Sequence, residues 1–297
     1  MKKKIVVVGS MGMDLVVTSS RRPRAGETII GDELHIIPGG KGANQAVAAA
    51  RLGADVTMVG AVGTDQFGEM VLANFEKEGV STDFIRSIPG THTGTAHIIV
   101  AEGDNSIVVV PGANSLVDQA QVDQVKECIK EAAIVLLQLE IPLETVKYVV
   151  DFCYEHQVPV ILNPAPAQSL PEEFIQKVTY LTPNEHEVCI IFGCDDVDAI
   201  LQKYPNQLIL TEGEKGVRFF DGKQMVQVPA LSVEVVDTTG AGDTFNAGFA
   251  VALTQGFPLK EAVRFGCVAA GLSVTKLGAQ GGMPTLNELK QHLGEIF

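Results

Sequence analysis

The most informative part of this sequence is Asp237-Thr238-Thr239-Gly240-Ala241-Gly242-Asp243-Thr244-Phe245-Asn246-Ala247-Gly248-Phe249. The residues that continue it to Leu253 are small and apolar, which predicts the first turns of a buried helix. Before it, the β-branched residues of Ser232–Val236 predict the end of a strand. Gly240, Ala241 and Gly242 therefore lie where a strand passes into a helix, and their amides have no partner within the helix. These amides and the helix dipole favour an anion such as phosphate.

Asp243 falls in the first turn of this predicted helix. One acid there could simply be a helix-start residue, stabilised by the dipole by roughly 0.3–1 kcal/mol. Asp237 and Asp243, however, bracket two threonines and two glycines, which is more than a helix cap requires. We interpret Asp243 as a general base that takes a proton from an incoming hydroxyl group beside a phosphate pocket.

The composition limits the possible partners. The 297 residues include 22 basic and 36 acidic side chains, a formal charge of −14, which argues against nucleic acid or an anionic membrane as the main partner. The apolar run Ile5–Val8 is too short for a signal peptide, and no run approaches the length of a membrane span. The five cysteines form no C-x-x-C pair, so we expect a soluble protein of the reducing cytoplasm.

The order of predicted elements indicates one α/β domain over residues 1–297, with a doubly wound, mainly parallel sheet flanked by helices and ligands at the carboxyl ends of its strands. The predicted strands are Ile5–Val8, Val56–Val59, Ile134–Leu139, Val158–Leu162, Thr179–Leu181 and Gln207–Thr211, followed by an antiparallel pair at Gly216–Phe220 and Gln224–Val228. The predicted helices are Gly39–Arg51, Asp65–Glu78, Val117–Glu131, Leu143–His156, Glu185–Phe192, Val197–Tyr204, Leu259–Val274 and Leu286–Leu293.

Two segments interrupt the alternation of strand and helix. Asp14–Thr18 and Thr28–Ile37 are rich in β-forming residues with no helix between them, and Thr93–Ala101 with Ser106–Val110 reads as a hairpin. We expect residues 12–38 and 93–111 to form a small antiparallel β lid that covers a site.

The segment Gly39–Gln45 is dense in glycine and contains a lysine, but its spacing is not that of a P-loop. It could be a flexible loop before a helix; alternatively, Lys41 and Asn44 could bind the hydroxyls of a polyol. Asp14 could be a solvated acid or a ligand contact. Glu140 ends a buried strand, which is where doubly wound enzymes place ligand contacts.

Two further loops follow predicted strands. Asn184 and Glu187 fit ordinary helix-start chemistry, but their shared face could also hold water on a hydrated Mg²⁺ ion. The loop Thr211-Glu212-Gly213-Glu214-Lys215-Gly216 suits nucleotide contacts, although alone it is a weak signal. The histidines show no metal-binding spacing, and no serine lies in a G-x-S-x-G motif.

Together these stretches resemble the ribokinase family of carbohydrate kinases. The segment Gly39-Gly40-Lys41-Gly42-Ala43-Asn44-Gln45-Ala46 is similar to the amino-terminal signature of the family, and Asp237–Phe245 to its carboxyl-terminal one. Gly278-Ala279-Gln280-Gly281-Gly282-Met283-Pro284 is also similar. The resemblance covers essentially the whole chain. It implies transfer of the γ-phosphoryl group of ATP to the 5-hydroxyl of D-ribose.

The resemblance also implies roles for individual residues. Asp243 would be the base, with Gly240, Ala241 and Gly242 at the anion hole. The sugar site would comprise Gly12, Asp14, Gly40, Lys41, Asn44, Glu140 and Asp243. The nucleotide site would comprise Asn184, Thr211, Glu212, Gly213, Glu214, Lys215, Gly216, Gly242 and Cys267. Glu187 would lie near Mg²⁺ through water, and an activating K⁺ would be bound by Asp237, Thr239, Ser273, Lys276, Gly278 and Gly282.

The resemblance further implies a homodimer formed through the lid. Two positions depart from the family pattern: Gly12 stands where some members have an asparagine, and Cys267 where an asparagine or histidine often contacts adenine. Two alternatives to a ribose kinase stay open. One is a kinase for another small sugar or nucleoside, such as deoxyribose, fructose or adenosine, and the other is a catalytically silent sugar- or nucleotide-binding sensor.

Overall fold

A six-stranded parallel sheet forms the middle layer of the molecule in the computed structural model, which describes residues 3–193 and 196–293. All neighbouring strands pair in parallel, which confirms the predicted α/β architecture. Their order across the sheet is β10 (Tyr180–Leu181), β9 (Val160–Leu162), β8 (Ile134–Leu137), β1 (Lys4–Val8), β4 (Asp55–Gly63) and β5 (Ser81–Ile88).

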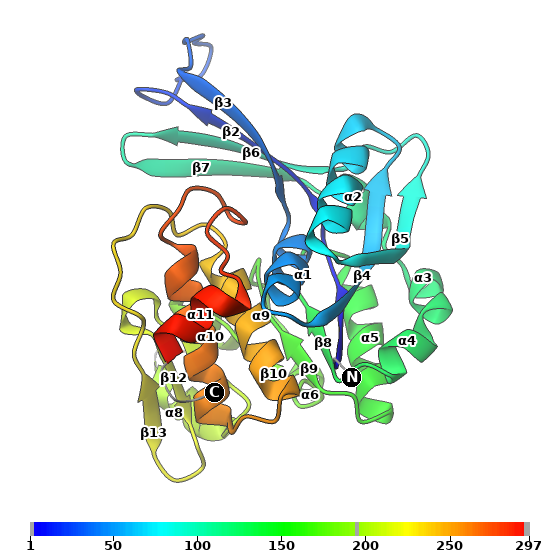
Figure 1. Cartoon of the computed structure of the whole chain (residues 1–297), viewed down its shortest axis with the longest axis vertical. Helices are drawn as coiled ribbons and strands as arrows, with labels where there is room; N and C mark the ends of the chain where they lie inside the picture. The colour runs from blue at the N-terminus through cyan, green and yellow to red at the C-terminus, as the bar shows by residue number, and fades with distance from the viewer. Residues whose placement is uncertain (1–2, 194–195, 294–297) are drawn as a thin grey trace.

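Helices cover both faces of this sheet because the central strand β1 is apolar on both. Ile5 and Val7 pack into one core, and Val6 and Val8 into the other. The first core contains side chains of α1 (Lys41–Arg51), α2 (Gln66–Glu78), α9 (Ala241–Thr254), α10 (Leu259–Ser273) and α11 (Leu286–Leu293). The second contains side chains of α3 (Gln119–Gln124), α4 (Lys126–Lys130), α5 (Leu143–Glu155), α6 (Glu172–Ile175), α7 (Glu185–Phe192) and α8 (Val197–Lys203). Helix α9 packs against both α1 and α10 (Figure 1).

Several boundaries differ from the predictions. The expected helix at 117–131 is divided into two short helices, α3 and α4, because the backbone leaves the helical conformation at Val125. A 3₁₀ turn, η1 (Gly112–Leu116), precedes them. The expected strand at 232–236 is wrong: this segment is irregular, and the amide of Val236 donates instead to the carbonyl of Val274. Strand β5 was not predicted, because it is a half-exposed edge strand without a buried apolar run.

The strand predicted at 207–211 is shorter than expected. Only β11 (Leu210–Thr211) forms, and it pairs antiparallel with β12 (Val217–Phe220), which pairs with β13 (Met225–Val228). A parallel bridge from Leu208 to Leu181, and another from Thr211 to Asn184, still attach this segment to β10 and the residues that follow it. A second 3₁₀ turn, η2 (Gly213–Lys215), follows β11.

The two predicted interruptions form one four-stranded sheet, which we call the lid. Its order is β3 (Glu33–Gly39), β2 (Gly12–Thr18), β6 (Gly94–Ala101) and β7 (Asp104–Val110). The β2–β6 pair is parallel, so the lid is mixed, not purely antiparallel, and the predicted strand at 28–37 begins only at Glu33. Figure 1 shows the lid projecting from one end of the main body.

Three glycines lie side by side at the base of the lid. Gly12 is paired with Gly39 on one side and with Gly94 on the other. A Cβ atom on Gly12 would lie 2.2 Å from the carbonyl oxygen of Gly94, so only glycine allows this close approach of the strands.

Among the described residues, no helix is both long and apolar enough to span a membrane. Cys128, Cys153, Cys189 and Cys267 carry free thiols, and Cys194 lies outside the described residues.

Candidate active site

The carboxylate of Asp243 lies in the first turn of α9 and is 6% exposed. Gly240 precedes the helix with a φ of 78°, a conformation that favours glycine. Asp243 Oδ2 accepts a hydrogen bond from Asn44 Nδ2 at 3.0 Å, and Oδ1 accepts one from Gln45 Nε2 at 3.1 Å. Gln45 Nε2 also donates to Asn163 Oδ1 at 3.3 Å. Two side-chain amides from α1 thus hold the carboxylate that the sequence predicted as a base.

Both a positive charge, that of Lys41, and a negative charge, that of Glu140, act on the carboxylate of Asp243. Burial raises the pKa of Asp243, whereas the charge of Lys41 and the hydrogen bonds from Asn44 and Gln45 oppose that shift. Burial alone would lower the pKa of Lys41, but the negative charges of Asp243 and Glu140 raise it above its ordinary value. Lys41 therefore stays protonated beside a carboxylate that can take up a proton.

The start of α9 offers unpaired amide donors. The amide of Ala241 donates to Thr238 O at 3.2 Å. Within the described residues, the amides of Gly242 and Asp243 have no acceptor. A Cβ atom on Gly242 would meet nothing within 4 Å, so there is open space beside this residue. An anion at this helix end would find the donors of Gly242 and Asp243, while that of Ala241 is already engaged.

Asp14 and Glu140 bring further carboxylates to the same site. Burial, followed by the negative charges of Glu140 and Asp243, raises the pKa of Asp14 to about 6. Glu140 Oε2 accepts hydrogen bonds from Ser10 Oγ at 2.5 Å and from the amide of Lys41 at 3.0 Å. Such clusters of like charge are costly for folding and are typical of ligand sites.

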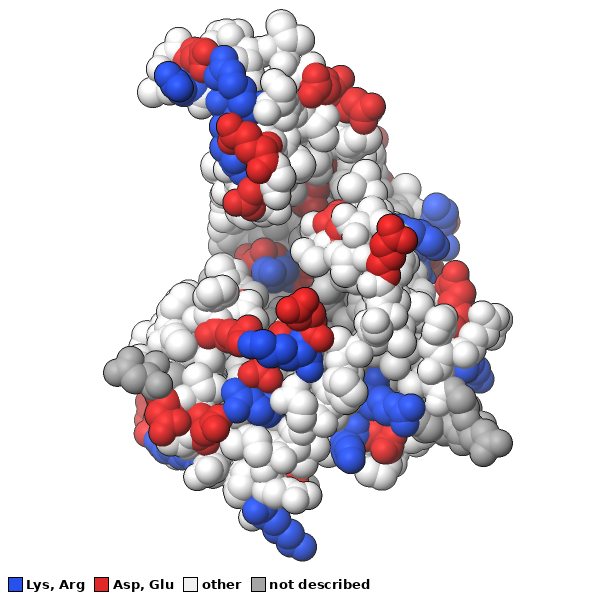
Figure 2. All heavy atoms as spheres, turned by 90° about the vertical axis from the view of Figure 1, so that its left-hand side faces the viewer, with Lys and Arg blue, Asp and Glu red and all other residues white. Residues whose placement is uncertain are grey.

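Gly12 and Gly40, which were predicted for the sugar site, and the neighbouring Gly39 shape its walls. A Cβ on Gly39 would lie 2.3 Å from Asp14 Oδ1, and one on Gly40 would lie 2.8 Å from the Cα of Met11. Gly12 lies in β2 two residues before Asp14, at the base of the lid. Figure 2 shows a hollow between the lid and the body with both acidic and basic side chains inside it.

The loops predicted to bind a nucleotide also come together. Asn184 forms a bridge to Thr211 and caps α7 in a reciprocal capping box with Glu187. Burial raises the pKa of Glu187, while the hydrogen bond from the amide of Asn184 and the charge of Lys41 oppose that shift.

The members of the 211–216 loop have different surroundings. Glu212 is buried and paired with Arg218 at 2.9 Å, which anchors the loop. Lys215 is exposed and pairs with Glu185 at 3.2 Å. Glu214 is exposed, and Gly213 and Gly216 adopt positive φ angles. Cys267 lies on α10, where burial raises the pKa of its thiol to about 12.

The residues predicted to bind a monovalent cation lie on two adjoining segments. Asp237 Oδ1 accepts hydrogen bonds from the amide and hydroxyl of Thr239, and Oδ2 accepts one from the amide of Gly278 at 2.8 Å. Burial alone would raise the pKa of Asp237, but these hydrogen bonds lower it, so the carboxylate is ionised. A Cβ on Gly282 would lie 1.9 Å from Ser273 O, so the carbonyl of Ser273 lies against the backbone of Gly282. Lys276 is exposed between them.

Four polar residues of this site were not singled out from the sequence as functional: Ser10, Gln45, Asn163 and Gln280. Ser10 and Asn163 follow the ends of β1 and β9, so their position after a buried strand was a usable signal. Gln45 follows Asn44 in α1, and no spacing rule distinguishes its amide from that of an ordinary helix residue.

Comparison with known proteins gives a consistent assignment. The sequence model of the pfkB family of carbohydrate kinases matches residues 2–286. The chain is 54% identical to a ribokinase from Bacillus subtilis, over 98% of this chain and 99% of that protein. Its fold is similar to the crystal structure of a ribokinase from Thermotoga maritima, with a TM-score of 0.89 and 37% identity over 98% of this chain and 99% of that one. It is also similar to the ribokinase of Arabidopsis thaliana complexed with ribose and ATP, with a TM-score of 0.88 and 34% identity over 98% of both chains.

Proposed function

The chain belongs to the pfkB family of carbohydrate kinases, and on that basis we propose that it transfers the γ-phosphoryl group of ATP to the 5-hydroxyl of D-ribose. The similarity to the Bacillus subtilis ribokinase over nearly the whole chain supports ribose as the acceptor. One structural observation carries the proposal: the buried carboxylate of Asp243 is held between Asn44 and Gln45 at the unpaired start of α9.

The proposed reaction is an in-line displacement. Asp243 accepts the proton of the 5-hydroxyl while that oxygen attacks the γ-phosphorus of ATP. A new P–O bond forms as the bond from phosphorus to the bridging oxygen of ADP breaks, so the electron pair leaves with ADP. The amides of Gly242 and Asp243 and the ammonium of Lys41 offset the negative charge of the transferring group.

The sugar would occupy the space between the base of the lid and the body. Asp14, Asn44 and Glu140 offer oxygen and amide groups of the kind that bind vicinal hydroxyls. Gly12, Gly39 and Gly40 let neighbouring protein atoms approach the backbone closely at the edge of this space, where a Cβ atom would clash with them. Lid residues 12–38 and 93–111 would then cover the sugar and exclude water. The lid and the body together would form a single domain that spans residues 1–297.

The nucleotide would lie along Asn184 and the 211–216 loop, with its phosphates toward Gly242, and Cys267 on the adenine side. Mg²⁺ would arrive with the phosphates, since among the described residues no group of three or more His, Cys, Asp or Glu side chains could hold a metal ion. Mg²⁺ keeps most of its waters in such sites, and Glu187 would contact one of them. A bound Mg²⁺ would supply positive charge beside the phosphates.

A monovalent cation such as K⁺ fits the segment around Asp237. The ionised carboxylate, the carbonyl of Ser273 and the turn at Gly278 and Gly282 would supply oxygen ligands. The remaining predicted ligands, Thr239 and Lys276, would contribute through their backbone carbonyls. Bound K⁺ would fix the segment that leads into α9.

A homodimer formed through the lid is also proposed. Strand β7 is the edge of the lid, and its residues are exposed on both faces, Val108 at 67% and Val109 at 54%. Leu34 and Ile36 add exposed apolar surface on β3. An apolar edge of this kind would aggregate unless another surface covered it, and a second copy of the same lid supplies a matching one.

A coupled assay of ADP release tests the function directly. ATP is offered with D-ribose, 2-deoxyribose, fructose and adenosine, and kcat/KM is compared across the four acceptors. We expect ribose to give the highest value, and ³¹P NMR of the product to show a 5-phosphate. If ribose gives a kcat/KM no higher than that of another acceptor, the assignment of ribose is wrong. If no acceptor leads to ADP release, the alternative of a catalytically silent sugar- or nucleotide-binding sensor is favoured.

A further inference from the structure

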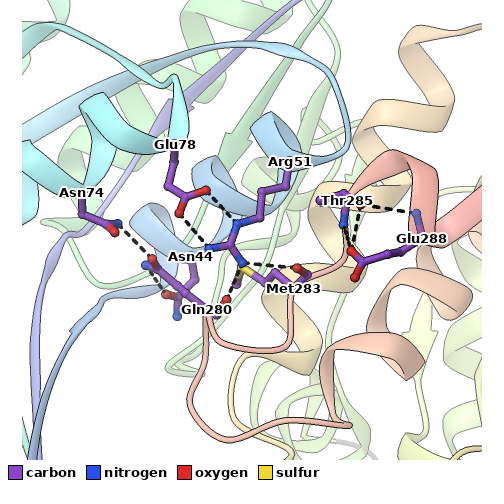
Figure 3. Close-up of polar contacts among 8 residues, drawn as sticks. All are labelled: Asn44, Arg51, Asn74, Glu78, Gln280, Met283, Thr285 and Glu288. Atoms are coloured by element: carbon purple, nitrogen blue, oxygen red, sulfur yellow. Dashed lines mark hydrogen bonds and ion pairs between the residues drawn. The ribbon is translucent and has the colours of Figure 1, made fainter.

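Gln280 belongs to the loop that contains the proposed cation ligands, yet its side chain points toward Asn44, which contacts the carboxylate of Asp243. It is 8% exposed, and its Nε2 donates to Asn44 Oδ1 at 3.0 Å. Its Oε1 accepts a hydrogen bond from Asn74 Nδ2 at 3.0 Å. Because Asn44 Nδ2 donates to Asp243, three side-chain amides form a continuous chain from α2 to the carboxylate. Figure 3 shows the part of this chain from Asn74 through Gln280 to Asn44.

The carboxylate of Asp243, at one end of this chain of amides, determines which group donates in each of its hydrogen bonds. An ionised carboxylate only accepts, so Asn44 must present its Nδ2 group to Asp243. Its Oδ1 then faces away and needs a donor, which is Gln280 Nε2. Asn44 is 5% exposed, so without Gln280 its carbonyl would lose its hydrogen bond in a buried place. The amide could then turn away from the carboxylate.

The loop itself is attached to the two helices that carry this chain. Arg51 Nη1 donates to the carbonyls of Gln280 at 2.5 Å and Met283 at 3.2 Å. The same guanidinium forms two hydrogen bonds of 2.8 Å with Glu78 at the end of α2 (Figure 3). The contacts of Arg51 hold the loop in place, and the loop in turn sets the position of Gln280. The orientation of the Asn44 side chain then depends on Gln280.

We propose that Gln280 is a positioning residue for the phosphoryl transfer, which orients the side chain of Asn44 and through it the carboxylate of Asp243. Gln280 lies between Gly278 and Gly282, two of the proposed cation ligands, so it also links that loop to the base. The role rests on the proposed function, since it assigns a partner to the base of that reaction.

The test variant is Gln280→Met, which keeps the approximate shape and removes both polar atoms. The matched control is Gln121→Met, because Gln121 is 2% exposed and its side chain also makes two hydrogen bonds, both from Nε2, to the carbonyls of Gly60 and Phe84. Both variants are expected to lower Tm. Only Gln280→Met is expected to lower kcat, on the order of tenfold, with KM for ATP nearly unchanged.

The pH profile gives a second readout that a purely structural role would not move. Loss of the oriented amide removes a donor that favours the ionised base, so the acidic limb of kcat/KM should move to higher pH in Gln280→Met. The other charged groups that act on Asp243 are Lys41, Glu140, Asp14 and Glu187, and they are the same in both variants. A shift confined to Gln280→Met is therefore attributable to the amide chain.

A third readout needs no activity. In protein labelled with ¹⁵N-asparagine and free of substrates, the side-chain amide signal of Asn44 is assigned with Asn44→Ser. Gln280→Met should change this signal and speed its exchange with solvent, and Gln121→Met should not. An unchanged signal, or a changed signal with unchanged kcat, overturns the proposal. If the wild type fails to phosphorylate ribose, the proposed function falls, while the Asn44 signal still shows whether Gln280 orients that amide.

If Gln280→Met does not fold, Asn74→Ala tests the chain from its outer end. The variant removes only the donor to Gln280 Oε1, so the Asn44 signal and kcat should change in the same direction by a smaller amount. No change in either would overturn the proposal.

Discussion

Asn44 and Asp243 are 199 positions apart in the sequence, and the side-chain amide of the first donates to the carboxylate of the second at 3.0 Å. The contact joins the start of α1 to the start of α9, two helices that pack on the same face of the sheet. It places the two glycine-rich segments of the chain at one site. Both substrates of a kinase reaction can therefore be held by residues that surround a single base.

Asp243→Asn is expected to lower kcat by roughly 10²–10⁴-fold, the usual contribution of a general base. Asparagine has nearly the same shape but cannot take up the proton of the hydroxyl. Affinity for ribose should change only modestly, as measured by isothermal titration calorimetry. Unchanged turnover in a folded variant would defeat the assignment of the base.

Gly242→Ala is expected to separate folding from catalysis. A Cβ atom here meets nothing within 4 Å, and alanine in a helix is more stable than glycine by roughly 0.5–1 kcal/mol, so Tm should hold or rise. kcat/KM should nevertheless fall, because the methyl group occupies the space proposed for the phosphates.

Gly248→Ala is the matched control in the same helix. Its Cβ would lie 3.0 Å from the Cβ of Ala269 and 3.1 Å from the Cα of Gly266, so overpacking should cost about 1–3 kcal/mol of stability. The folded fraction should keep its activity. A Gly242→Ala variant that is fully active would place the phosphates elsewhere.

Asp14→Asn is expected to flatten the pH dependence of stability between pH 3.8 and about pH 6. The pKa of Asp14 is raised across this window, first by burial and then by Glu140 and Asp243. The folded state therefore holds the proton more tightly than the unfolded chain, so the contribution to stability is complete below the lower pKa and is lost as pH rises through the upper one.

A difference of about two between the pKa values of Asp14 in the folded and unfolded states corresponds to at most about 3 kcal/mol of the free energy of unfolding. Urea unfolding of the wild type and Asp14→Asn at several pH values measures it. The free energy of unfolding of the wild type should fall relative to that of the variant as pH rises. Parallel curves for the two proteins would contradict the raised pKa.

Replacing K⁺ with tetramethylammonium is expected to lower activity and Tm, because the large ion cannot enter the segment around Asp237. Binding to the folded state alone stabilises it by mass action, so Tm should rise with K⁺ concentration. Asp237→Asn should remove this dependence, since it deletes the ionised ligand. A variant with the full K⁺ response would exclude Asp237 from the site.

Val108→Glu is expected to convert a dimer into monomers, because it places a charge on the exposed edge strand of the lid. Sedimentation velocity measures the change. Tyr154→Glu is a control on α5, where another exposed apolar side chain, 60% exposed, lies away from the lid. Equal effects of the two substitutions, or a monomeric wild type, would count against assembly through the lid.

Local sequence patterns predicted most of the fold because each strand and helix carries its own signal. The buried run Ile5–Val8 indicated a central strand, and Asp65 and Gly79 marked the two ends of α2 as its caps. The failures have a common cause. β5 and the segment 232–236 have similar β-branched residues, but only β5 finds a neighbouring strand, and that depends on the rest of the chain.

For the site, the sequence alone determined which residues have the right chemistry: an acid beside glycines at a helix start, and a lysine and asparagine after a second glycine turn. Only the tertiary structure decided which of them meet. It paired Asp243 with Asn44 and Gln45, and it brought Gln280 to Asn44. The amide of Ala241 donates to Thr238, whereas within the described residues the amides of Gly242 and Asp243 stay unpaired. The physical reason is that an amide finds its partner by distance and direction in space. Sequence patterns describe only neighbours along the chain, and these partners come from elements that pack together after the strands have paired.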